Sequence, residues 1–267
     1  MSLLVVDDLR AGHGLLEAVR GISLAVDEGR TLALVGANGA GKTTLLRSIA
    51  GAHPAKVGRI VLDGVDVTKL KVHQRVQRGL ALVPEGRRIF PQLTVRENLL
   101  VAGKRARRGD WNLDTVLDAF PMLRGVLDHK GSELSGGQQQ ATAIGRAMMT
   151  NPRVLLIDEL SLGLAPVAVD AVYQSVSSLL TGGATVVLVE QDLERAMSVS
   201  HRMLCMLEGR VVLEGDTSGL TREQVTAAYF GVPDHVRAAG SDRATTEPGG
   251  DAESPDPMTP GRPKELP

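Results

Sequence analysis

Short runs of apolar residues recur along the chain and are the clearest guide to its fold. The runs are rich in Val, Leu and Ile and show little alternation with polar residues, which is typical of parallel strands buried on both faces of a sheet. Apolar positions at helical spacing lie between them. The pattern therefore predicts an α/β domain, with strands at 3–6, 31–35, 80–83, 154–157, 185–189 and 202–207 and helices at 42–50, 138–149, 167–180 and 193–200.

Between about residues 87 and 150 the periodicity is helical, and no run has the character of a buried strand. We therefore expect a helical subdomain inserted into the sheet domain. Seven bases and one acid lie between Arg87 and Arg108, a balance that would suit anionic lipid headgroups or acidic loops of a partner. A solvated basic face explains the cluster at 104–108 equally well, and Phe90 and Trp111 either face a partner or belong to the core.

The composition changes after Pro233. Residues 234–267 contain no aromatic residue, seven acids, four bases and many prolines. A segment of this kind buries too little apolar surface to offset the entropy lost when it is ordered. The sequence thus predicts one folded domain over 1–233 and a disordered tail over 234–267.

Charge and hydropathy exclude two classes of protein. With 30 basic and 31 acidic residues the net charge is -1, so no overall field draws the chain onto nucleic acid, and we expect no nucleic-acid partner. The longest apolar stretches have about four residues, against about 18 for a membrane span. The N-terminal segment has no basic region before its apolar run and does not read as a signal peptide. We expect a cytoplasmic protein that does not itself enter the membrane.

One glycine-rich segment, TLALVGANGAGKTTLL, joins a predicted buried strand to a predicted helix. It fits the phosphate-loop pattern G-x-x-x-x-G-K-[ST], in which glycines bring backbone N–H groups to the phosphates, the lysine adds positive charge and the hydroxyl binds Mg²⁺. We therefore predict a site for a nucleoside triphosphate and Mg²⁺, with Thr43 as a metal ligand. The predicted nucleotide-binding residues are Gly36, Asn38, Gly39, Ala40, Gly41, Lys42, Thr43 and Thr44.

Two acids follow the apolar run at 154–157. In a phosphate-loop protein, an aspartate at the tip of a neighbouring strand holds the Mg²⁺ that neutralises charge on the transferred phosphoryl group, and Asp158 has this place. The adjacent Glu159 can orient or deprotonate the attacking water. An isolated acidic pair more often begins a solvated loop, but Lys42 and Thr43 upstream favour the catalytic interpretation.

The string LSGGQ at 134–138 stands just before a helical run, which makes Ser135 a natural N-cap. Together with GANGAGKT and the strand ending in two acids, it resembles the ATP-binding-cassette (ABC) ATPases over about residues 3–231. The segments VPEGRRIFPQLTVRENL, DELSLGLAP and VEQD are most similar to ATP-binding subunits of branched-chain amino acid importers. The resemblance implies a P-loop NTPase (RecA-like) core with a mostly parallel sheet, an N-terminal antiparallel β portion and the inserted α-helical subdomain.

The resemblance also implies how ATP is held. Two nucleotide domains are expected to pair head to tail, so that each ATP lies between the phosphate loop of one chain and the LSGGQ segment of the other. The residues expected to act in trans are Ser135, Gly136, Gly137 and Gln138.

Three further residues fall on family positions with a different residue from the usual one. His13 stands where an aromatic ring stacks on adenine, and it is equally well a plain turn residue. Glu85 stands where a glutamine links the Mg²⁺ site to the membrane partner. A carboxylate there can still engage Mg²⁺ or its water, so Glu85 is a predicted metal residue, and a solvated loop acid is the other interpretation. Gln191 stands where a histidine contacts the γ-phosphate; glutamine can donate a hydrogen bond there but cannot carry charge.

Two leucines also depart from the family pattern. Leu160 replaces the proline that usually follows the catalytic acid, which we expect to change only the stiffness of the loop. Leu164 stands where many members have an aspartate that communicates across the dimer, so the sequence leaves that communication open.

The function that the resemblance implies is ATP hydrolysis that drives an uptake transporter, most similar to those for branched-chain or related amino acids. The expected partners are two membrane permease subunits, a sister ATPase or a second copy of the chain, and indirectly a periplasmic or lipid-anchored solute-binding protein. The expected place is the cytoplasmic face of the membrane.

Three alternatives stand beside this reading. The first is the same ATPase in a urea or short-amide importer, and the second is a soluble ABC ATPase that acts on DNA or ribosomes. A kinase or GTPase with the same phosphate loop is the third, which LSGGQ and the lack of an Asn-Lys-x-Asp string disfavour.

Overall fold

The structure is a computed structural model that describes residues 2–103 and 107–231. The prediction of a disordered tail over 234–267 lies outside the described residues, and so does part of the basic cluster at 104–108. Within the described part of the chain, no helix is long and apolar enough to cross a membrane.

A six-stranded sheet forms the centre of the domain and confirms the expected α/β core. Its strand order is β10-β9-β3-β8-β7-β6, and all neighbours are parallel except the hairpin of β9 and β10. Every residue of β3, β7 and β8 is buried, as their continuous apolar runs predict. The strands are β3 (Thr31–Val35), β6 (Leu80–Val83), β7 (Val154–Asp158), β8 (Thr185–Val189), β9 (Arg202–Leu207) and β10 (Arg210–Asp216).

A second, antiparallel sheet of order β2-β1-β4-β5 lies in the N-terminal part. The first strand is longer than the predicted 3–6, because shifts in its register with β2 and β4 interrupt the apolar pattern at Asp7 and Asp8. Asp8 has a positive φ of 40° there, as expected where a strand bends at an irregularity. The strands are β1 (Ser2–His13), β2 (Leu16–Asp27), β4 (Ala55–Leu62) and β5 (Val65–Asp66).

Helix α1 (Lys42–Ala50) connects the two sheets through the hydrophobic core. Leu45, Leu46 and Ile49 are fully buried in one cluster with side chains of both sheets. Helices α7 and α8 pack on β3 and β9 in a smaller cluster. The remaining helices of the sheet domain are α2 (Val72–Arg78), α6 (Pro166–Thr181), α7 (Leu193–Val199) and α8 (Arg222–Phe230).

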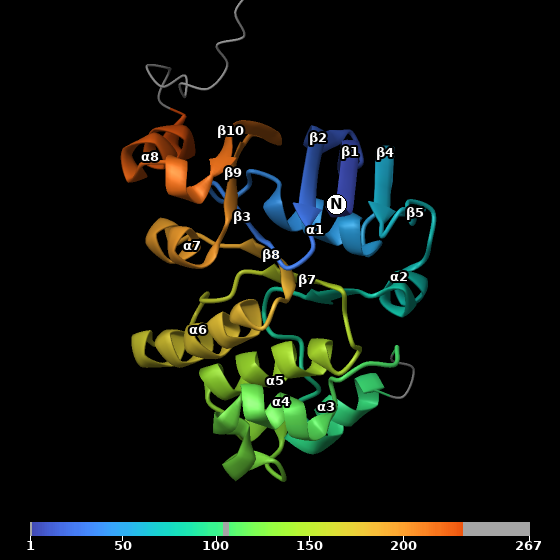
Figure 1. Cartoon of the computed structure of the whole chain (residues 1–267), viewed down its shortest axis with the longest axis vertical. Helices are drawn as coiled ribbons and strands as arrows, with labels where there is room; N and C mark the ends of the chain where they lie inside the picture. The colour runs from blue at the N-terminus through green and yellow to red at the C-terminus, as the bar shows by residue number, and fades with distance from the viewer. Residues whose placement is uncertain (1, 104–106, 232–267) are drawn as a thin grey trace, which may run out of the picture. The chain divides into compact units, whose positions relative to one another are not determined.

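The segment expected to be helical is helical, and α3, α4 and α5 gather at the end of the domain far from β1, β2 and β4 (Figure 1). Their core joins the opposite face of the parallel sheet and includes the fully buried Phe120. Trp111 packs against this core, whereas Phe90 is 49% exposed. The elements are α3 (Val95–Gly103), α4 (Leu113–Ala119), α5 (Gly136–Met148) and the 3-10 turns η1 (Pro121–Val126) and η2 (Gly131–Glu133).

Candidate functional site

The loops that carry the predicted chemistry follow β3, β7 and β8, which are neighbours in the central sheet. Because these strands are parallel, their carboxyl ends meet at one edge of the sheet, the usual place for a ligand in an α/β fold. An open cleft lies there. It is lined by Ala18, Asn38, Gly39, Gly41, Lys42, Thr43, Thr44, Glu85, Glu159, Leu162 and Gln191.

The phosphate loop can take its shape only with glycine at two positions. Gly36 and Gly41 have φ values of 146° and 100°, a region that residues with a side chain rarely adopt. A Cβ on Gly36 would lie 2.2 Å from the carbonyl oxygen of Met206, and one on Gly41 would lie 2.1 Å from that of Ala18. The N-cap of α1 is Gly41, which has no side chain to accept from the first-turn N–H groups. These N–H groups therefore suit the oxygens of a phosphate.

Lys42 is buried at the start of α1 with 5% of its surface exposed. Its Nζ donates to the carbonyl oxygens of Gly36 at 2.7 Å and Ala37 at 3.1 Å. Burial lowers the pKa of Lys42, and the charges of Glu159 and Asp158 oppose that shift. An ammonium group has three donors, so one remains for an anion in the cleft.

Asp158 and Thr43 form a site that suits Mg²⁺. Thr43 Oγ1 donates to Asp158 Oδ1 at 2.9 Å, while the fully buried Asp158 Oδ2 has no hydrogen-bond partner. Burial raises the pKa of Asp158, against the hydrogen bond from Thr43. A buried carboxylate oxygen without a partner needs a cation or a donor, and Glu85 lines the cleft together with Thr43. Mg²⁺ takes one or two carboxylates and completes its shell with water and phosphate oxygens, so this donor set fits it.

The two residues predicted to be catalytic lie in contact. Gln191 Nε2 donates to Glu159 Oε1 at 2.7 Å, which joins the loop after β8 to the loop after β7. Glu159 has a φ of 59°, and a residue other than glycine in this left-handed region costs about 1–3 kcal/mol. The structure thus places a carboxylate, held by an amide and a strained backbone, beside the phosphate loop.

Several predicted site residues do not line this cleft. Gly36, Ala40 and Asp158 are buried, although residues of the same loops line it. His13, at the exposed end of β1, is not among its lining residues and lies with its ring centroid 4.6 Å from that of His53. Ser135 is the N-cap of α5, as expected, with Gln138 N donating to its Oγ at 3.3 Å. No residue of 135–138 is among those that line the cleft. The adenine contact of His13 and the action of Ser135 on a second chain therefore stay predictions.

Two polar residues close to the cleft escaped the sequence analysis. Glu190, which follows β8, is 1% exposed; its place after an apolar run is the same signal that pointed to Asp158. Arg87 has a φ of 63° and donates to Gln139 Oε1 and to the carbonyl oxygen of Gly163, both at 3.0 Å. In the sequence, Arg87 stands out only as one of the bases of the inserted segment.

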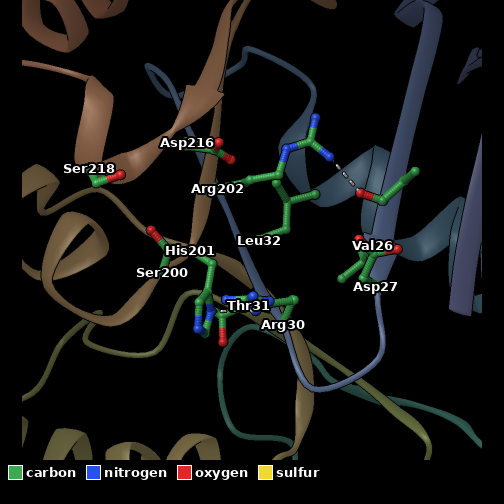
Figure 2. A pocket seen from close by; sticks show the side chains of 11 residues that line it. Val26, Asp27, Arg30, Thr31, Leu32, Ser200, His201, Arg202, Asp216 and Ser218 are labelled. Atoms are coloured by element: carbon green, nitrogen blue, oxygen red, sulfur yellow. Dashed lines mark hydrogen bonds between the residues drawn. The ribbon is translucent and has the colours of Figure 1, made fainter. Parts of the chain in front are cut away.

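A second cavity lies at the opposite, amino-terminal edge of the central sheet, where β3 and β9 begin (Figure 2). Two of its polar side chains already have partners in the chain, whereas the buried hydroxyl of Thr31 has none. His201 Nδ1 accepts from the backbone N–H of Thr31 at 3.1 Å, and Arg202 Nη1 donates to the carbonyl oxygen of Ala25 at 3.2 Å, the dashed line in Figure 2. Because the phosphate loop, Asp158 and Glu159 all lie at the carboxyl edge, we assign the functional site to that edge.

Comparison with known proteins identifies the family of the chain. The family described as ABC transporter matches residues 19–161, a range that holds both the phosphate loop and Glu159. The chain is 38% identical over 233 residues to the high-affinity branched-chain amino acid transport ATP-binding protein BraG of Pseudomonas aeruginosa, which covers 86% of this chain and 100% of the relative.

Two further relatives carry different names. A probable branched-chain amino acid transport ATP-binding protein LivF of Archaeoglobus fulgidus is 32% identical over 81% of this chain and 93% of its own length. The lipopolysaccharide export system ATP-binding protein LptB of Haemophilus influenzae is 30% identical over 86% of this chain and 98% of its own length.

Solved structures share the fold. A nucleotide-free ATP-binding cassette from an ABC transporter superposes with a TM-score of 0.74 at 26% identity, over 87% of this chain and 96% of its own. A dimeric ATP-binding cassette in a post-hydrolysis state, bound to ADP and Pi, gives a TM-score of 0.71 at 25% identity, over 81% of this chain and 100% of its own. With the phosphate loop, the Asp158–Glu159 pair and these likenesses together, the chain belongs to the ATP-binding subunits of ABC transporters and is an ATPase.

Proposed function

We propose that this ATPase drives an uptake transporter for branched-chain or related amino acids. The observation that carries the catalytic part is the contact of Glu159 with Gln191 beside the phosphate loop. The substrate class is supported by the similarity to BraG over the whole length of that relative. The similarity to LptB does not argue for an exporter with equal weight, because its identity is lower.

In the proposed reaction, the backbone of 36–44 and the free donor of Lys42 bind the phosphates of ATP. Glu159 orients the attacking water and accepts its proton, and Gln191 fixes the carboxylate that does so. Thr43 and Asp158 would hold Mg²⁺, with Glu85 toward the same ion. When bound, Mg²⁺ neutralises negative charge that develops on the transferred phosphoryl group.

The proposal includes closure of the site by a second ATPase domain, either a sister subunit or a second copy. The cleft is open, and Ser135, the exposed N-cap of α5, lies outside it. The N-terminal N–H groups of α5 would meet the γ-phosphate bound to the other chain. ATP that binds the closed pair more tightly than the open one would shift the pair toward closure, and hydrolysis would release it.

Two membrane permeases would receive this motion at the groove between the sheet domain and the helical subdomain. The groove is lined by residues of both parts, including Val76, Arg88, Phe90, Val101 and Arg146. The guanidinium carbon of Arg146 lies 5.3 Å from the centre of the exposed Phe90 ring, so an apolar side chain with basic neighbours would meet the permease here. Such a contact would place the chain at the cytoplasmic face of the membrane.

Arg87 gives the proposed route from the permease to the ATP site. Its two hydrogen bonds tie the loop of 85–90 to α5, just after Ser135, and to Gly163, just after Glu159. A displacement of this loop by a permease would therefore act both on the segment of Glu159, in the chain's own ATP site, and on the segment of Ser135, which is proposed to meet ATP bound to the other chain.

Isolation of the tagged full chain from native membranes tests the proposal. We expect two permeases, a second ABC ATPase and a solute-binding protein to co-purify, and the binding protein to prefer branched-chain amino acids in uptake assays. Phe90→Asp should reduce recovery of the permeases, whereas Phe230→Asp, at a residue 72% exposed on α8, should not. Ribosomal or DNA-bound partners would overturn the transport role, and a binding protein that selects urea or short amides would overturn the substrate.

A further inference from the structure

Glu190 is a buried acid that the chemistry described above does not use. It follows the last residue of β8, and its backbone N–H donates to the carbonyl oxygen of Leu34 in β3 at 3.2 Å. Its side chain makes no ion pair with any other described residue. A buried carboxylate that has no cation is costly to the folded state, and a neutral or apolar side chain would fill the position at less cost.

The carboxylate of Glu190 contacts both catalytic segments. Its Oε2 accepts from Ser161 Oγ at 3.0 Å and from the backbone N–H of Gln191 at 3.0 Å. Ser161 lies two residues after Glu159, and the side chain of Gln191 donates to Glu159 Oε1. These contacts close a ring through Glu159, Ser161, Glu190 and Gln191.

Both catalytic residues need such support. The left-handed backbone of Glu159 persists only if its surroundings hold it. On its C-terminal side, the next residue, Leu160, is buried and anchors the chain. The long side chain of Gln191 loses conformational entropy when it is held against Glu159. Hydrogen bonds from Ser161 and from the Gln191 backbone to one oxygen keep the two loops at a fixed separation.

The other carboxylate oxygen is enclosed by α6. Glu190 Oε1 and the hydroxyl of Tyr173 are both buried, and neither makes a hydrogen bond of ordinary geometry. Burial, then the charge of Glu190 and a hydrogen-bonding interaction with its carboxylate, raise the pKa of Tyr173, so the Tyr173 hydroxyl lies beside Oε1. Arg195 covers the Tyr173 ring at 5.1 Å and pairs with Asp170 at 2.9 Å. With α6 on this side, the carboxylate stays turned toward Ser161 and Gln191.

We propose that Glu190 is a positioning residue of the ATPase site, which holds Gln191 directly and the segment of Glu159 through Ser161. It touches neither the cleft nor ATP, and it acts on hydrolysis only through these neighbours. The inference rests on the catalytic roles proposed for Glu159 and Gln191.

The test is a double-mutant cycle on the full chain, with phosphate release, ATP binding and thermal unfolding measured for each variant. We expect Glu190→Ala to lower kcat about ten- to a hundredfold, as misplacement of a catalytic group does, while the Kd for ATP changes by less than about twofold. Glu190→Gln keeps an oxygen that accepts both hydrogen bonds and should recover most of the lost rate. In a Gln191→Ala background, Glu190→Ala should cost less than about threefold, because the group it positions is gone.

Equal loss from Glu190→Ala in both backgrounds, a parental kcat, or a change in KM alone would overturn the inference. If Glu190→Ala does not fold, Ser161→Ala in the same two backgrounds gives the cycle, since it removes a hydroxyl from a half-buried residue. Ser178→Ala is the matched control, because that hydroxyl donates only within α6, to Gln174. A parent chain that releases no phosphate would instead overturn the ATPase site itself, which separates the two failures.

Discussion

The two edges of the central sheet carry cavities of similar size, about 480 Å³ at the amino edge and about 460 Å³ at the carboxyl edge. Their polar groups differ. At the amino edge, His201 and Arg202 are bonded to backbone groups of the chain, and the buried hydroxyl of Thr31 lacks a partner. At the carboxyl edge, Asp158 keeps a buried oxygen without a partner, and Glu159 holds a strained backbone. An unpartnered buried carboxylate oxygen beside a strained backbone, more than the volume of a cavity, marks the edge where a ligand completes the structure.

The largest effect that this contrast predicts is at Glu159. Glu159→Gln should lower ATP hydrolysis about a thousandfold, because the amide cannot take the proton of the attacking water, while ATP binding is kept. Phosphate release and equilibrium ATP binding measure the two quantities. Glu208→Gln is a matched control, since Glu208 also has a positive φ, of 48°, yet lies outside the cleft. Hydrolysis at the parental rate by Glu159→Gln would remove Glu159 as the base.

Lys42 tests the phosphate loop. Lys42→Met keeps the buried stem and removes the charge, and we expect hydrolysis to fall about a hundredfold, as it does when one donor to a developing charge is lost. ATP binding should weaken as well, which distinguishes this variant from Glu159→Gln. Lys69→Met, at an exposed lysine after β5, serves as the control. If Lys42→Met bound ATP as tightly as the parent, the phosphates would not lie on this loop.

Ser135 tests whether the open cleft is closed by another chain. Ser135→Arg puts a bulky side chain at the start of α5 and should lower hydrolysis about tenfold through a clash across the proposed dimer. ATP binding by the isolated chain should not change, because Ser135 does not line its cleft. The control is Ser198→Arg, at an exposed serine of α7. Normal hydrolysis by Ser135→Arg would contradict action in trans.

The smallest effect is expected at the amino edge. Arg202→Ala removes the hydrogen bond to Ala25 and the ion pair with Glu214, and should lower the free energy of unfolding by about 1 kcal/mol. The kcat and KM for ATP should stay at parental values. Thermal unfolding and phosphate release on the same preparation check both. A loss of hydrolysis without a loss of stability would make this cavity functional and end the contrast.

Much of the sheet could be predicted from sequence because its signals are local. The buried runs at 31–35 and 185–189 match β3 and β8 in both bounds, and the helix at 42–50 matches α1. The full lengths of β1, β2 and β4 could not be predicted from the sequence, because these strands are only partly buried and pair with irregular register. Their polar positions and bulges hide the period on which such a prediction depends.

The candidate site also has one part that the sequence predicts and one part that only the structure shows. Lys42, Thr43, Asp158 and Glu159 could be placed together because each follows a buried parallel strand or starts the helix after one. The contacts of Glu190 with Ser161, and of Arg87 with Gln139 and Gly163, join segments 29, 52 and 76 positions apart. Such side-chain geometry has no local pattern in the sequence, so only the structure reveals it.

The left-handed backbone of Glu159 has a consequence for protein engineering. Glycine at this position would relieve strain of about 1–3 kcal/mol, yet it would delete the group that we propose activates water. Stability thus favours glycine at this position and turnover favours glutamate, a trade-off common at active sites. Selection of a mutant library for heat resistance alone would therefore enrich variants that bind ATP but do not hydrolyse it.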